Sequence, residues 1–317
     1  MKKFFVFLAA VLLVPCTSFA AWAPDGDINV IVAYKAGSGT DTGARVLASE
    51  AQKKIGKTLV INNLPGADGK IGWTKLVNAK PDGQTIGFIN LPTFTTLAIE
   101  PDATFTVADV VPIANHLTET GVVAVKADSP IKSLKDLVEQ AKKNPNLKAS
   151  TNGKRASNHT AAQLLAKSAG FDYKALPYGG TADQLLALRQ GEVDFTCAKV
   201  ADVANLIKGD KPELRVIGVF AEERLPELPD VPTLKEEGYY DKWYGAARGL
   251  VAPKGTPQEI IDFYVEAFKN TMEDPETIAA HKKANLNLDF KDNKQFGALI
   301  SDQEKFSRDV DKNLYSE

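Results

Sequence analysis

The stretch "IVAYKAGSGTDTGAR" (31–45) decides the fold expected for this chain, because it reads as a strand, a glycine-rich turn and a helix start. Gly37 and Gly39 allow the backbone to approach a ligand closely. In such a turn the exposed N–H groups and the helix dipole converge on an anion. An ordinary strand–helix turn, with Asp41 capping the helix, has the same local pattern. No Gly-Lys-Ser/Thr follows, which excludes a phosphate-binding P-loop.

On either side of this turn, short apolar runs alternate with helical patterns, which is typical of α/β architecture with mainly parallel sheets. The first unit is predicted to contain, in chain order, strand 28–34, helix 40–55, strand 58–63, helix 70–79 and strand 84–90. This order makes half of a doubly wound domain.

A second unit of the same kind starts after the apolar run 121–127. Ser133 followed by Asp136 predicts a capped helix start. A strand at 147–151 leads into the loop "NGKRASNH", and "PYGGTAD" (177–183) is another glycine-rich helix start. Two such helix starts, in two α/β units, can face one cleft from opposite sides.

The late segments are expected to return to the first unit through the proline-rich run 224–234. Thr256, followed by Pro257, predicts the capped start of a helix, and 293–313 predicts an amphipathic helix. Both helices are expected to pack on the first unit. The predicted boundaries are a signal peptide at 1–20, a discontinuous first domain at 21–119 and 231–317, and a second domain at 120–230.

The first twenty residues have the features of a cleaved secretory signal. Lys2 and Lys3 precede an eleven-residue apolar run, and small residues follow up to Ala20. Cys16 leaves lipid attachment as an alternative. We therefore expect export to the periplasm.

Composition narrows the function of the mature chain. Removing 20 of 317 residues leaves 297, with 36 basic against 40 acidic side chains. This balance argues against a nucleic-acid surface, which needs a concentrated basic stripe. A single cysteine, Cys197, remains, so an intramolecular disulfide is not possible.

The residues usually found in catalytic and metal sites are sparse. His116, His159 and His281 follow no metal-binding spacing. Cys197 lies in an apolar strand, which predicts a buried and inert thiol. A G-x-S-x-G nucleophile elbow is also missing from the sequence. We therefore predict no catalytic residue, no metal and no cofactor.

Several stretches together resemble the signatures of Bug/TctC-type proteins, the periplasmic solute-binding components of tripartite tricarboxylate transporters. The similar segments are "AYKAGSGTDTGAR" (33–45), "INNLPGADGKIG" (61–72), "AKPDGQTIGF" (79–88), "YGGTADQLLALRQGEVD" (178–194), "LPDVPTLKEEGY" (228–239) and "GLVAPKGTP" (249–257). They are spread over nearly the whole mature chain.

The resemblance implies a type II-like periplasmic binding protein with two α/β domains. Each domain would be a mainly parallel sheet flanked by helices, and crossover strands would join the domains. It also implies that the domains close on a small carboxylate, held largely by backbone N–H groups and bridging water. The ligand-binding residues that it implies are Tyr34, Ala36, Gly37, Ser38, Gly39, Thr40, Asp41, Asn90, Pro92, Thr93, Ser157, Tyr178, Gly179, Gly180, Thr181 and Ala182.

The chain departs from the family pattern at two points. Ala33 stands where the family usually has proline, which is a modest backbone change. Arg155 and Ala156 replace a Gly-Ser pair in the usual G-x-G-S-x-x-H motif. We hypothesise that Arg155 also binds ligand, because a guanidinium can hold a distal acidic group. The alternative is that Lys154 and Arg155 form a solvated surface pair.

Sequence and resemblance together predict a monomeric periplasmic binding protein that captures a small organic carboxylate and delivers it to membrane transporter subunits. The expected ligands are di- or tricarboxylates, aromatic acids and acidic amino acids. One alternative is a binding protein of another transporter class, for an inorganic anion or an amino acid, with Asp41 as the candidate partner of an ammonium group. A second alternative is an enzyme on the same scaffold, since fold alone does not decide function.

Overall fold

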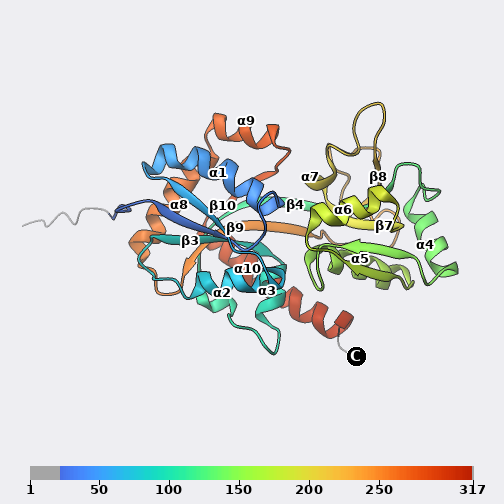
Figure 1. Cartoon of the computed structure of the whole chain (residues 1–317), viewed down its shortest axis with the longest axis horizontal. Coiled ribbons are helices and arrows are strands. Elements are labelled where there is room, and N and C mark those ends of the chain that lie inside the picture. Colours follow the sequence, from blue (N-terminus) through green and yellow to red (C-terminus); the bar gives the residue numbers. More distant parts are fainter. Residues whose placement is uncertain (1–21, 316–317) are drawn as a thin grey trace, which may run out of the picture.

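The computed structural model describes residues 22–315, so the predicted signal peptide lies outside the described residues. Figure 1 shows two lobes joined by long strands that cross between them. The first lobe contains both the early and the late segments of the chain, and the second lobe contains the middle. Within residues 22–315, no helix is both long enough and apolar enough to cross a membrane.

The first lobe begins with the predicted alternation of strands and helices. Its early elements are β1 (Ile28–Val32), α1 (Gly39–Ile55), β2 (Leu59–Asn63), α2 (Lys70–Val77), β3 (Thr85–Leu91) and α3 (Thr93–Ala98). The strand β1 pairs in parallel with both β2 and β3. Because side chains alternate along a strand, Val30 and Val32 pack in the core on the α1 side of the sheet. Ile31 and Ala33 pack on the other side, with Trp73 of α2.

The second lobe repeats this alternation. Its elements are α4 (Leu134–Lys143), β5 (Lys148–Thr151), α5 (Ser157–Ala169), β6 (Lys174–Pro177), α6 (Thr181–Gln190), β7 (Phe195–Lys199), α7 (Val200–Val203) and β8 (Leu214–Val219). Ser133 caps α4 as predicted, with its Oγ accepting a hydrogen bond from the Asp136 N–H at 3.1 Å. Phe195 is buried in the core between the sheet and α5.

The chain returns to the first lobe through β9 (Gly245–Pro253), which lies later than the predicted residue 231. Leu234 and Tyr244 still pack in the core of the second lobe. The elements that follow are α8 (Gln258–Met272), α9 (Pro275–Lys283), β10 (Leu288–Lys291), α10 (Asn293–Val310) and the π-helix η3 (Asp311–Tyr315). Thr256 is not the cap of α8, because its Oγ1 donates to the Pro253 carbonyl at 2.7 Å and Pro257 holds the cap position.

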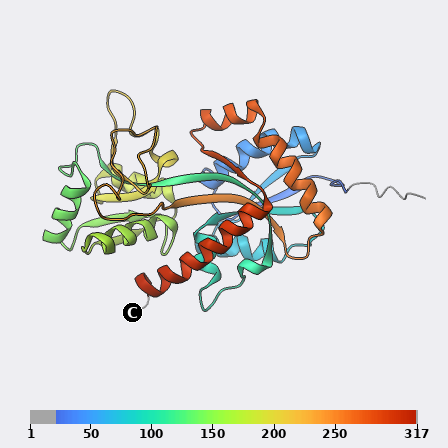
Figure 2. The same ribbon diagram turned by 180° about the vertical axis from the view of Figure 1, so that it is seen from behind.

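The helix α10 runs along the back of the first lobe, and the chain continues from it toward the second lobe (Figure 2). There η3 contacts α5. Lys167 of α5 donates a hydrogen bond to the Asn313 carbonyl, and Arg155 Nη1 lies 3.0 Å from Asp311 Oδ1. The C-terminal segment therefore bridges the two lobes alongside the sheet.

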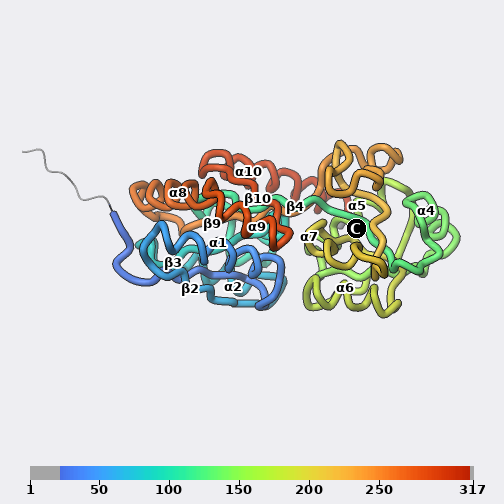
Figure 3. The backbone as a smooth tube through the Cα atoms, turned by 90° about the horizontal axis from the view of Figure 1, so that it is seen from above, coloured from blue at the N-terminus to red at the C-terminus, as the bar shows by residue number. Residues whose placement is uncertain are grey.

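One mixed sheet runs through both lobes; β1, β2 and β3 pair in parallel in the first lobe and β5, β6 and β7 in the second, and the crossover strands are antiparallel. In the described chain its order is β2-β1-β3-β9-β4-β7-β5-β6, with β8 and β10 also paired to β4 (Val110–Lys126). β4 and β9 are antiparallel and carry the sheet across the gap between the lobes (Figure 3). Only 121–127 of β4 was predicted, because the buried polar residues Asn115, His116 and Glu119 interrupt the apolar pattern before it.

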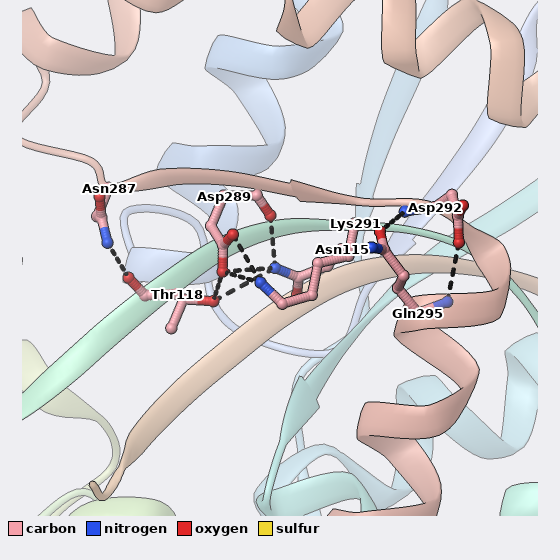
Figure 4. Close-up of polar contacts among 7 residues, drawn as sticks. All are labelled: Asn115, Thr118, Asn287, Asp289, Lys291, Asp292 and Gln295. Atoms are coloured by element: carbon pink, nitrogen blue, oxygen red, sulfur yellow. Dashed lines mark hydrogen bonds and ion pairs between the residues drawn. The ribbon is translucent and has the colours of Figure 1, made fainter.

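A cluster of polar contacts joins β10 and the residue Asn287 before it to β4, and Asp292 caps the start of α10 next to it (Figure 4). Asn115 Nδ2 donates to the Asp289 carbonyl at 2.7 Å, and Asn287 Nδ2 donates to the Thr118 carbonyl at 2.8 Å. The Asn287 backbone N–H also donates to Glu119 Oε1 at 3.2 Å. These bonds hold the part of β4 from which the chain crosses to the second lobe.

Candidate ligand-binding site

A cavity of about 510 Å³ lies between the two lobes. The first lobe contributes the loop after β1, the loop 65–69, and Asn90 of β3. The second lobe contributes the first turns of α5 and α6 and the end of β7. The predicted residues that line it are Tyr34, Ala36, Gly37, Ser38, Gly39, Thr40, Asn90, Ser157, Gly179, Gly180, Thr181 and Ala182.

The loop after β1 is shaped by its own side chains. Gly37 has a φ of 81°, which favours glycine, and Ser38 caps α1 by accepting a hydrogen bond from the Asp41 N–H at 3.2 Å. The Asp41 carboxylate in turn accepts hydrogen bonds from the Gly37 N–H at 2.8 Å and from Asn63 Nδ2 at 2.9 Å. Burial opposes ionisation of this carboxyl, but the bonds from Arg45, Gly37 and Asn63 hold the pKa of Asp41 below its usual value. Asp41 thus supports the loop and does not line the cavity.

The glycine-rich turn of the second lobe faces the first turn across the cavity. Gly180 precedes α6 with a φ of 156°, and Thr181 and Ala182 in the first turn of α6 line the cavity. Tyr178 lies outside the cavity lining and donates from its hydroxyl to Glu192 Oε2 at 3.1 Å. Pro92 and Thr93, at the start of α3, also lie outside the lining.

Arg248 was not predicted from the sequence, yet it lines the cavity from β9. Its side chain is buried, at 5% exposure, and its Nε and Nη1 donors have no hydrogen-bond partner in residues 22–315. The guanidinium lies against the first residue of α1, because a Cβ placed on Gly39 would be 3.0 Å from Arg248 Nη2. A buried cation therefore stands at the positive end of a helix, and both favour an anion.

Lys199, at the end of β7, is a second buried cation in the lining and was also missed. Its Nζ donates to Ser157 Oγ at 3.1 Å and to Asn158 Oδ1. Burial lowers the pKa of Lys199 to about 8, and the nearby Asp202 acts in the opposite direction. The cavity lining thus contains two buried cations, Arg248 and Lys199, that were not among the residues expected from the sequence.

A charged residue inside an apolar strand is the sequence signal that marks both cations. Arg248 interrupts "GAARGLVAP" (245–253), and Lys199 closes "VDFTCAK" (193–199). A strand buried on both faces accepts a charge only where the charge is paired or faces a ligand. This signal cannot distinguish the two cases without the tertiary structure.

Arg155 lies in a different cavity, of about 740 Å³, and not in the interdomain lining described above. Its Nη1 is 3.0 Å from Asp311 Oδ1 and 3.9 Å from Glu100 Oε1. Its backbone has a positive φ of 60°, and its N–H donates to His159 Nδ1 at 2.9 Å. The sequence predicted that Arg155 binds an acidic group of the ligand. In the structure its acidic neighbours are instead Asp311 and Glu100 of the protein itself.

Two of the histidines pair with each other inside the first lobe. His116 Nε2 and His281 Nε2 lie 2.7 Å apart in the core of the first lobe, and both rings are fully buried. Across the described part of the chain, no group of three or more His, Cys, Asp or Glu side chains could hold a metal ion.

Comparison with known proteins matches this architecture to a family. A family model described as "Tripartite tricarboxylate transporter family receptor", TctC, matches residues 43–314. The chain belongs to the TctC family. A UPF0065 protein of Cupriavidus necator, in the gbd 5' region, is 30% identical over 308 residues, which cover 95% of this chain and 91% of that protein.

Solved structures of similar proteins have the same fold. The periplasmic binding protein BugD is 27% identical, with a TM-score of 0.84, and the match covers 92% of this chain and 98% of BugD. MatC of Rhodopseudomonas palustris, solved with bound malate, has a TM-score of 0.83 at 24% identity, covering 90% of this chain and 99% of MatC. The predicted two-domain α/β fold of the periplasmic binding proteins is therefore confirmed. Family and neighbours are periplasmic solute-binding proteins, so the chain is a solute-binding protein and not an enzyme.

Proposed function

We propose that this protein captures a small organic carboxylate in the cavity between its lobes and delivers it to the membrane subunits of a tripartite tricarboxylate transporter. The observation that carries the proposal is Arg248, whose buried Nε and Nη1 donors are left without a partner by the described residues. The guanidinium lines the cavity beside Gly39, at the N-terminus of α1.

The energetics of this arrangement favour a bound anion. A buried charge without a partner costs several kcal/mol, and a planar carboxylate can accept two parallel hydrogen bonds from a guanidinium. The dipole of α1 adds a smaller favourable term at the same place. A carboxylate seated here would satisfy the donors that the protein leaves open.

The relatives support an organic acid as the ligand. MatC, which shares the fold, was solved with malate, and the family is described by its tricarboxylate transporters. We also propose that the protein is exported to the periplasm and acts there as a monomer. Capture would shift the population toward a closed form, with β4 and β9 as the connections about which the lobes move.

One observation favours an acidic amino acid as the organic carboxylate. Asp68, Asp183 and Asp202 line the cavity together with the cations, and their carboxylates are suitable partners for an ammonium group. Asp41, the candidate from the sequence, is instead bound to Gly37, Asn63 and Arg45.

A thermal-shift screen of refolded, ligand-free protein tests the proposal. The panel is citrate, C4-dicarboxylates, aromatic carboxylates, aspartate, glutamate and inorganic phosphate. A ligand at a hundred times its dissociation constant adds about 2.7 kcal/mol of stability, which moves the midpoint by several degrees. A shift with phosphate alone, or with no member of the panel, would contradict an organic carboxylate.

Two variants assign the shift to the cavity. Arg248→Gln is expected to weaken carboxylate binding by about thirtyfold or more, because truncating one partner of a buried charge pair costs at least about 2 kcal/mol. Its ligand-free form should be no less stable than the wild type, since a buried unpaired charge is removed. Arg224→Gln, which changes an exposed arginine paired to Glu236, is the matched control. Equal ligand affinities in the wild type and Arg248→Gln would refute the assignment.

A further inference from the structure

The cavity holds buried cations on both of its sides, one from each lobe. Arg248 belongs to the part of β9 that pairs with Asn90 of β3 in the first lobe. Lys199 belongs to β7 in the second lobe, where it is 2% exposed and lines the same cavity. The proposed carboxylate site needs one cation, so the second requires an explanation.

Lys199 is held in place by a chain of buried hydrogen bonds. Its Nζ donates to Ser157 Oγ and Asn158 Oδ1, both in the first turn of α5. The Asn158 amide donates from Nδ2 to Gln184 Oε1 at 2.9 Å, and Gln184 Nε2 donates to the Cys197 carbonyl at 2.6 Å. This chain fixes the Asn158 oxygen toward the ammonium, so Lys199 is preorganised before a ligand arrives.

These contacts leave one N–H donor of Lys199 unused by the described residues, in a place where burial works against its charge. An ammonium has three N–H donors, of which Ser157 and Asn158 take two within the described chain. Asp202, Cys197 and Glu119 favour the charged form of Lys199, while Arg248 acts on it as a like charge. Burial and Arg248 thus both work against the ammonium charge of Lys199, and Asp202 offsets them only in part, because the net effect still lowers the pKa of Lys199.

We propose that Lys199 selects ligands with a second acidic group. Arg248 and the N-terminus of α1 hold one carboxylate from the first lobe, and Lys199 with the first turn of α5 holds the other from the second lobe. A monocarboxylate neutralises one cation and leaves the other desolvated in the closed cavity, which is a penalty that a dianion avoids. This inference rests on the proposed function.

Matched ligand pairs test the selection. Succinate and butyrate share a four-carbon chain and differ by one carboxylate, as adipate and hexanoate do for six carbons. By calorimetry at pH 7, the wild type should bind the better dicarboxylate at least about thirtyfold more tightly than its monocarboxylate partner. Lys199→Met should lower the dicarboxylate affinity by about tenfold or more and change the monocarboxylate affinity by no more than about twofold.

The other variants separate this role from a general loss of charge. Arg248→Gln should weaken binding of both members of a pair. Lys208→Met removes an exposed cation that does not line the cavity, so it should leave the preference within about threefold of the wild type. A Lys199→Met variant that weakens both members equally, or a wild type without preference, overturns the proposal. If no carboxylate binds at all, the proposed function itself fails.

A pH profile of the wild type gives a second test that needs no variant to fold. Burial lowers the pKa of Lys199 to about 8, so we expect its positive charge to be lost above that pH in the ligand-free protein. Dicarboxylate affinity should therefore fall by up to about tenfold per pH unit above that value, while monocarboxylate affinity falls much less. Parallel profiles for the two ligands would overturn the role of Lys199.

Discussion

Replacing Glu119 by glutamine should change how the stability of the protein depends on pH. Glu119 is 2% exposed in β4, and its Oε1 accepts a hydrogen bond from the Asn287 N–H at 3.2 Å. Glutamine keeps the shape and the accepting oxygen but cannot ionise. Burial raises the pKa of Glu119 to about 7, against the attraction of Arg248.

The size of the effect follows from this pKa. Going from an ordinary value of 4.5 to about 7, at 1.36 kcal/mol per unit, corresponds to about 3 kcal/mol. The folded state binds the proton more tightly than the unfolded state does, so the contribution of Glu119 is fully present below about pH 4.5. It is lost as the pH rises through about 7. Glu119→Gln should therefore gain about 3 kcal/mol of stability relative to the wild type between these limits.

Denaturant unfolding of ligand-free protein, at intervals from pH 4.5 to 7.5, measures this difference. Taking the difference between variant and wild type at each pH cancels the contributions of other groups, such as His159, whose pKa burial lowers to about 4. Glu222→Gln, which removes an exposed carboxyl, is the control. A difference that stays level across this range, or that falls with rising pH, would refute the reasoning.

Three further changes test separate parts of the structure. Gly39→Ala should displace the Arg248 guanidinium, because the new Cβ would be 3.0 Å from Nη2; we expect about tenfold weaker carboxylate binding by calorimetry, and unchanged affinity would contradict this contact. Arg155→Ala should lower the free energy of unfolding, measured with denaturant, by less than about 1 kcal/mol, because the ion pair with Asp311 is partly exposed. The carboxylate affinity of this variant should stay within about twofold of the wild type. A large loss of affinity would place Arg155 in the binding site. Burial raises the pKa of the Cys197 thiol to about 12, so a thiol reagent should label it only after unfolding; rapid labelling of the native protein would show that this strand is accessible.

Local signals in the sequence were sufficient for the turns and for most elements of both units. The helix start of α4 depends on Ser133 and Asp136, which are three residues apart, and the structure has the predicted cap. The turn at Gly37 likewise depends on its own neighbours. At the start of α8 the sequence offered neighbouring residues for the cap, and the prediction of Thr256 was wrong, because Pro257 holds the cap position.

The sequence by itself determined the alternation of strands and helices, the family and the glycine-rich loops of the site, because these depend on residues close together in the chain. Only the tertiary structure showed that β4 and β9 join one mixed sheet, since strand pairing depends on distant partners. The tertiary structure also showed that Arg155, which was predicted to bind ligand, forms an ion pair with Asp311 near the C-terminal end of the sequence. Arg248 and Lys199, both in apolar strands, line the cavity, because only folding decides which buried charges come to lie beside a cavity.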